Sequence, residues 1–199
     1  MGLEASASRL YWAHVDPTHS LSERRQQAAS ETWFPELSEA RRRYLLGELD
    51  KRFSPAHLRA LKALKPEAGA PTALICHWHL QWSDPLYREF TSDYLVGAWA
   101  QPDTGLNVDA VLGWLQGRGS YSEWSASTQR RLASGLLSTA VEAGFLKGSG
   151  RKKELRTVTV DGAGMDYLHS HLLSDEGEPG LGEEIFLSGT VSDPSGTQA

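Results

Sequence analysis

A helix, a turn and a second helix follow one another in the middle of the chain, and this order constrains the fold most. Asn107 can cap a helix over residues 108–116, because its side chain can accept a hydrogen bond from the first turn. After a turn rich in Gly and Ser, a second helix begins at Ser125 or Ser127. That helix ends at Gly144, since glycine is the residue best suited to the left-handed position after a helix.

A hairpin is predicted directly after the second helix. Residues 145–147 precede the glycine turn 148–150, and residues 155–160 are β-branched and alternate in polarity. Two helices followed by such a hairpin are typical of a winged helix-turn-helix. The chain is therefore expected to be mainly α, with a helical N-terminal half followed by a winged helix-turn-helix that carries a small β-hairpin wing.

Short helices with clear caps and proline stops fill the rest of the sequence. Ser54-Pro55 and Asp84-Pro85 each place a capping side chain before a proline in the first helical turn. The helices predicted outside the winged region cover residues 22–32, 38–52, 55–64, 72–82 with Thr72 as its cap, 85–100 and 165–173.

Composition divides the chain into three regions. The short linker 66–71 separates an N-terminal helical region, 1–70, from a helical and winged-helix region, 71–173. Residues 174–199 form an acidic tail that we expect to be mobile. Its apolar patch, residues 185–187, is a candidate for docking on the body of the protein or on a partner.

Charge is distributed very unevenly along the chain. The net charge is −5, yet residues 125–160 contain seven Lys or Arg and two Glu. Residues 161–199 contain eight Asp or Glu and no Lys or Arg. Because phosphate contacts act through a local patch and are screened beyond ~8 Å, the basic segment predicts nucleic-acid binding despite the overall charge.

Double-stranded DNA is the predicted partner, and two groups of side chains are candidates to contact it. A helix face of small residues can enter the ~12 Å major groove, and the helix start can bind a phosphate. Positive side chains around the hairpin turn favour contacts with phosphate over base reading. The helix candidates are Ser127, Thr128, Arg130, Arg131, Gly135 and Ser138, and the hairpin candidates are Lys147, Arg151, Lys152, Lys153 and Arg156.

Catalytic, metal and cofactor signatures are not found in the sequence. The sequence lacks a nucleophile elbow, a phosphate-binding glycine loop and an HExxH motif, so we expect no enzyme and no cofactor. Cys76, His77 and His79 invite a metal interpretation, but on a helix the two histidines point about 200° apart. We therefore predict that they pack in the interior and that no metal site forms.

No apolar run approaches the ~20 residues of a membrane span, and the first residues do not resemble a signal peptide. We therefore expect a cytoplasmic protein without membrane contact. The single cysteine excludes a disulfide within the chain.

With these elements in place, the chain resembles the BrxA-type small proteins of BREX bacteriophage-exclusion systems from about Leu37 to Leu173. The resemblance implies a mainly helical DNA-binding protein of a phage-defence system, which also includes a methyltransferase, an ATPase and a phosphatase-like protein. It supplies no active-site residues. The segments that carry it are residues 44–46, 52–53, 77–80, 84–87 with Phe90, 127–132 and 142–146.

Two other functions fit the same sequence. The protein could be an assembly subunit whose winged helix and acidic tail contact other defence proteins, or a winged-helix transcriptional regulator. A regulator is expected to dimerise on paired half-sites, whereas an assembly subunit need not.

Overall fold

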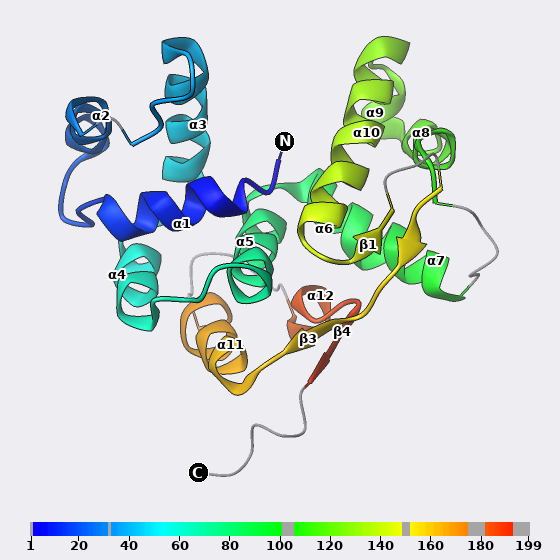
Figure 1. Ribbon diagram of the computed structural model, residues 1–199. Coiled ribbons are helices and arrows are strands. Elements are labelled where there is room, and N and C mark those ends of the chain that lie inside the picture. The colour runs from blue at the N-terminus through cyan, green and yellow to red at the C-terminus, as the bar shows by residue number, and fades with distance from the viewer. Residues whose placement is uncertain (1, 32, 101–105, 149–151, 175–181, 193–199) are drawn as a thin grey trace.

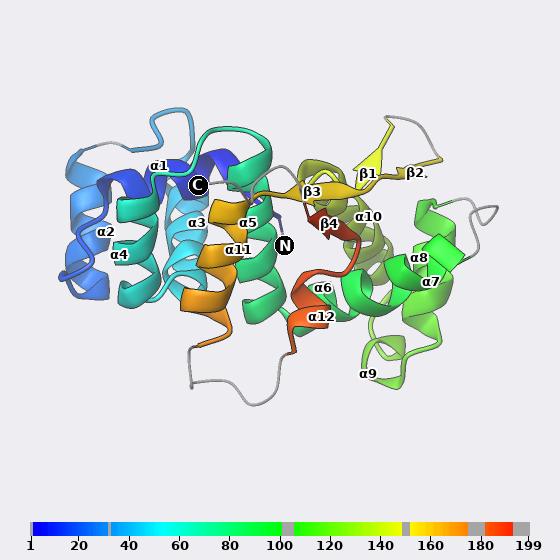
Figure 2. The ribbon, with the colours of Figure 1, turned by 90° about the horizontal axis from the view of Figure 1, so that it is seen from below.

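Helix α5 (Ala70–Ser83) lies at the centre of the molecule, surrounded by the other elements (Figures 1 and 2). The computed structural model describes residues 2–31, 33–100, 106–148, 152–174 and 182–192. Every residue from Thr72 to Gln81 is buried, as expected of a helix that is apolar on all sides. The predicted helix is confirmed, but its predicted cap is wrong. Gly69 is the N-cap, and the Thr72 hydroxyl, one turn later, donates to the Glu67 carbonyl instead.

Four described helices form the N-terminal half, and the sequence predicts three of them. Serines at positions 20, 38 and 54 accept hydrogen bonds from the first turns of the helices that follow them. The first helix was not predicted, because its N-cap residue, Glu4, makes no capping bond with its own side chain. The four are α1 (Ala5–His14), α2 (Leu21–Ser30), α3 (Glu39–Arg52) and α4 (Pro55–Leu64).

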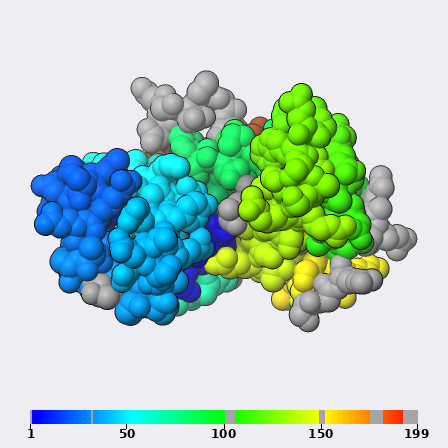
Figure 3. Space-filling model, turned by 90° about the horizontal axis from the view of Figure 1, so that it is seen from above, coloured from blue at the N-terminus to red at the C-terminus, as the bar shows by residue number. Residues whose placement is uncertain are grey.

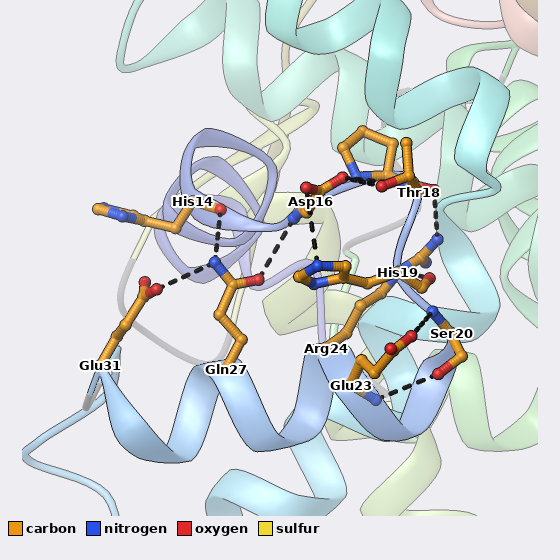
Figure 4. Close-up of polar contacts among 10 residues, drawn as sticks. His14, Asp16, Thr18, His19, Ser20, Glu23, Arg24, Gln27 and Glu31 are labelled. Atoms are coloured by element: carbon orange, nitrogen blue, oxygen red, sulfur yellow. Dashed lines mark hydrogen bonds and ion pairs between the residues drawn. The ribbon is translucent and has the colours of Figure 1, made fainter.

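The connection between α1 and α2 is fixed by side chains of α2 (Figure 4). Arg24 donates to the carbonyls of Pro17 and His19, both at 3.0 Å. Gln27 donates to the His14 carbonyl at 3.3 Å, and its oxygen accepts from the Asp16 amide at 3.4 Å. These bonds satisfy the backbone of the loop and set the angle between the two helices.

The predicted helix over residues 85–100 is confirmed as one helical run with a π-helical centre. It consists of α6 (Pro85–Glu89), η1 (Phe90–Leu95) and α7 (Val96–Ala100). The Asp84 side chain caps it by accepting from the Tyr87 amide at 3.1 Å. The run packs against α5, and the Gln81 side chain donates to the Thr91 hydroxyl between them.

The C-terminal half contains the remaining helices and the four strands of the described residues. The turn predicted over residues 117–124 contains the short helix α9, and the predicted helix over 165–173 begins earlier, at Gly162. The elements are α8 (Val108–Gln116), α9 (Gly119–Ser122), α10 (Ala126–Glu142), β1 (Leu146–Lys147), β2 (Glu154–Leu155), β3 (Val158–Val160), α11 (Gly162–Tyr167), η2 (Leu168–Leu172), α12 (Glu183–Phe186) and β4 (Thr190–Ser192).

The strand predicted over residues 155–160 is divided into two. Its first part, β2, pairs antiparallel with β1, and its second part, β3, pairs parallel with β4 from the end of the chain. Sequence alternation did not show this division, because it does not reveal with which strand each part pairs. The described protein is thus mainly α, with a few short strands.

The apolar patch at residues 185–187 docks on the body of the protein. Phe186 is fully buried, and its carbonyl accepts a hydrogen bond from the Trp78 indole at 2.9 Å. The Ile185 carbonyl accepts from the Gln81 amide, also at 2.9 Å. Residues 182–192 therefore have a fixed place beside α5, whereas the acidic stretches 175–181 and 193–199 lie outside the described residues.

Candidate nucleic-acid interface

Helix α10 presents one apolar and one polar face, as its sequence predicts. Its N-terminal end projects from the body, and its C-terminal end leads into β1 (Figure 1). Ser125 caps it by accepting from the Thr128 amide at 3.3 Å. Gly144, at φ +89°, ends the helix in the left-handed region, where glycine is strongly preferred. The side chains of Ala133, Leu136, Leu137, Ala140 and Ala143 are buried in the core.

Gln129 fixes the turn that leads into α10. Its buried side chain donates to the carbonyls of Tyr121 and Ser122 in α9 at 2.9 and 3.2 Å. Arg118, before α9, lies over the Trp114 ring and forms ion pairs with Glu89 and Asp93. These contacts therefore hold α8, α9 and α10 together and fix them against the α6–η1 run.

The polar face of α10 is exposed over its first three turns. Ser127, Arg131, Ser134 and Ser138 are exposed, and Thr128 and Gly135 are half-buried. Figure 3 shows a hollow with α10 on one side and α3 on the other.

Two charged side chains of α10 are already paired. Arg130 forms an exposed ion pair with Asp109 of α8 at 3.1 Å. Glu142, at the far end of the polar face, accepts hydrogen bonds from the backbone amides of Glu4 and Ala5 at 3.3 and 2.8 Å. The negative charge of Glu142 thus caps the start of α1, an arrangement that the helix dipole favours. Arg131 makes no ion pair with any residue that the structure describes.

The hairpin after α10 is short and is anchored to the start of α8. Leu146 pairs with Leu155, and Lys147 pairs with Glu154. The Lys153 amide donates to the Leu106 carbonyl at 2.7 Å, which adds a bridge to the segment that precedes α8. Gly148 adopts a φ of +116° at the turn, a value that requires glycine.

The predicted hairpin cations fall into different environments. Lys147, Lys152 and Arg156 are exposed and have no ion-pair partner among the described residues. Lys153 is half-buried, and its ammonium donates to the Gly148 carbonyl across the turn. Arg151 lies outside the described residues. Three exposed cations, Lys147, Lys152 and Arg156, therefore lie on the hairpin or directly after it.

The cysteine and histidine cluster on α5 is part of the packed interior. The His77 ring shares a hydrogen bond with the Tyr87 hydroxyl at 2.9 Å, and the His79 ring shares one with the Tyr167 hydroxyl at 2.7 Å. The two rings lie on different sides of α5, as the helical spacing predicts. Burial lowers the pKa of His77 to about 3 and raises the pKa of Cys76 to about 12.

Within the described ranges, no group of three or more His, Cys, Asp or Glu side chains could hold a metal ion. The described helices also include none that is long and apolar enough to span a bilayer.

The geometry defines a mainly helical protein with a basic helix-and-hairpin surface. Comparison with known families places it more narrowly: the BrxA family model matches residues 8–171, and the chain belongs to that family. The match confirms the resemblance seen in the sequence and extends it to α1. It makes the chain a component of a BREX phage-defence system, in a family whose members are generally non-catalytic. No curated protein matches the chain.

Proposed function

We propose that the protein binds double-stranded DNA through a winged helix-turn-helix made of α8, α10 and the β1–β2 hairpin. In this arrangement α10 enters the major groove and the hairpin lies over the phosphate backbone. The observation that carries the proposal is a set of exposed cations with no ion-pair partner among the described residues: Arg131 on α10, and Lys147, Lys152 and Arg156 on the hairpin and directly after it.

Three further features support this assignment. The bridge between Leu106 and Lys153 joins the hairpin to the segment before α8, which is the strand connection expected of a winged helix. The polar face of α10 consists mainly of small side chains, so the helix backbone can approach base edges closely. The cap at Ser125 leaves Ser127 exposed at the protruding helix start, where a phosphate can be bound.

The hairpin cations are expected to supply affinity that does not depend on sequence. Each phosphate contact contributes about −0.9 to the slope of log K against log salt on duplex DNA. The double variant Lys147→Ala/Lys152→Ala should therefore bind every duplex more weakly and flatten that slope by about 1.8. Binding of the purified protein to random duplex DNA at several salt concentrations measures the slope.

A charge-matched control distinguishes the loss of phosphate contacts from the loss of net positive charge. Arg43 and Lys51 on α3 are largely exposed and form only short-range pairs with Glu39 and Glu48. Arg43→Ala/Lys51→Ala removes the same charge far from the hairpin and should leave the slope unchanged. Equal slopes for the hairpin variant and the unmodified protein would contradict binding of the hairpin to phosphate.

The polar face of α10 can be tested with one exposed serine. Ser134→Glu places a long anionic side chain beside Arg131 without disturbing the core, because Ser134 is exposed. We expect DNA affinity to fall by at least tenfold while the melting temperature stays the same. Ser134→Gln, of equal size but neutral, should lose much less affinity. A folded Ser134→Glu variant that binds DNA normally would exclude insertion of this face into the groove.

A further inference from the structure

Two arginines from distant parts of the sequence line one pocket on the face that carries the hairpin. Arg9 of α1 and Arg156, just after β2, border a pocket of about 640 Å³ whose floor includes the start of α5. Both side chains are exposed, and neither forms an ion pair with a described residue. The one acidic side chain among the described lining residues is Glu142, whose carboxylate already caps α1.

A second basic pocket adjoins the first on the other side of Arg9. It has a volume of about 590 Å³, lies between α1 and α4, and includes Lys62 and Lys65 in its lining. The Lys62 ammonium donates to the Ala13 carbonyl at 3.0 Å, which holds its positive charge at the rim. The described lining of this pocket contains no acidic residue.

These pockets and the hairpin lie along one edge of the molecule. Figure 2 shows α1, the connection between α4 and α5, strand β3 and the β1–β2 hairpin along the same edge. Along this edge the hairpin carries Lys147 and Lys152, the first pocket is lined by Arg156 and Arg9, and the second is lined by Arg9, Lys62 and Lys65. A row of this kind suits an extended polyanion better than a single small anion, because each member can neutralise a successive phosphate.

We propose that the edge from Arg156 through Arg9 to Lys62 is a second phosphate-binding track that continues the DNA contact of the hairpin onto the N-terminal half. This inference rests on the proposed DNA binding and specifies how far the DNA contact extends over the protein. Bound duplex would contact both halves of the protein, so α1 and α4 would contribute to affinity as well as to the fold.

The double variant Arg9→Ala/Arg156→Ala tests the track. Both side chains are exposed, so the fold should be retained, which the melting temperature checks. On random duplex DNA of about 30 base pairs, we expect the salt slope to flatten by about 1.8, one phosphate contact for each arginine. The control Arg43→Ala/Arg59→Ala removes two exposed arginines that line neither pocket, and it should keep the slope of the unmodified protein.

The outcomes separate this inference from the function on which it rests. A flattened slope for the hairpin variant but not for Arg9→Ala/Arg156→Ala would overturn the track and leave DNA binding in place. Unchanged slopes for both variants would contradict the proposed function itself. Inorganic phosphate tests one alternative. If phosphate bound saturably only when Arg9 is present, while a variant without Arg9 kept the DNA slope of the unmodified protein, the pocket would be a small-anion site and the track would be overturned. Flattening by the Arg43→Ala/Arg59→Ala control to the same extent would also overturn it, because the effect would then reflect net charge.

Discussion

Lowering the pH from 7 to 5 should destabilise the fold by at least about 2 kcal/mol, because two neutral histidines are buried in α5. Burial lowers the pKa of His77 to about 3 and holds that of His79 well below its ordinary value. Their ring nitrogens His77 Nε2 and His79 Nδ1 are buried and make no hydrogen bond with the described residues. A proton added to either ring would therefore lie in the interior without an acceptor.

The direction of the effect follows from proton binding. Below its ordinary pKa of about 6.5, a histidine gains a proton in the unfolded chain but not in the folded one. Stability is therefore complete above about pH 6.5 and falls as the pH drops toward the folded pKa. A histidine with a folded pKa of about 3 loses about 1.4 kcal/mol per pH unit below pH 6.5, so His77 alone costs about 2 kcal/mol at pH 5, and His79 adds a loss of the same sign. That is a substantial fraction of the 5–15 kcal/mol typical of a domain.

Urea unfolding at pH 7 and pH 5 measures this loss, and substitutions identify its source. His77→Asn and His79→Gln each keep a polar atom near the one that contacts the tyrosine hydroxyl, but neither side chain titrates. The double variant should lose at least about 2 kcal/mol less than the unmodified protein between the two pH values. His14→Asn, which alters an exposed histidine, should lose as much as the unmodified protein. A double variant with the full pH dependence would show that other groups cause the acid sensitivity.

The acidic residues of the α1–α2 connection do not interfere with this measurement. Hydrogen bonds from Thr18 lower the pKa of Asp16, and hydrogen bonds from Ser20 lower that of Glu23. Any stability that these carboxylates add is present above their ordinary pKa values and is lost only at more acidic pH. The interval between pH 7 and pH 5 therefore reports mainly on the histidines.

Local signals in the sequence were sufficient to predict most helices. Ser38, Ser54, Asp84, Asn107 and Ser125 each cap a helix as expected, because capping depends on a few neighbouring residues. The opposed orientations of His77 and His79 also follow from helical spacing alone. By contrast, Thr72 resembles a cap in sequence, but the chain enters α5 one turn earlier, at Gly69.

Contacts between distant segments were beyond local reasoning. The split of the predicted strand into β2 and β3 depends on β4, which comes thirty residues after β3. The role of Glu142 at the start of α1 depends on how the two halves of the protein pack. Arg9 carried no motif, and only the folded chain places it beside Arg156. The division into regions 1–70, 71–173 and 174–199 remains a prediction, as do the individual DNA contacts.

Removal of one aromatic side chain near the C-terminus should reduce stability by several kcal/mol. Phe186 is fully buried and stacks near Trp82, with ring centroids 6.3 Å apart. Replacing a buried Phe with Ala costs about 3–5 kcal/mol, through lost burial and the cavity that remains. For a chain of this length, Phe186→Ala should lower the melting temperature by on the order of 10 °C.

Two further changes in the same segment determine whether its docking is responsible. Val191→Ala alters a half-exposed side chain and should shift the melting temperature by no more than a few degrees. Truncation after Leu173 should be at least as destabilising as Phe186→Ala, because it also removes the carbonyl acceptor of the Trp78 indole and one of the two acceptors of the Gln81 side-chain amide. If the truncated protein melted at the temperature of the full chain, residues 182–192 would not be part of the folded core, and the buried position of Phe186 would not contribute to stability.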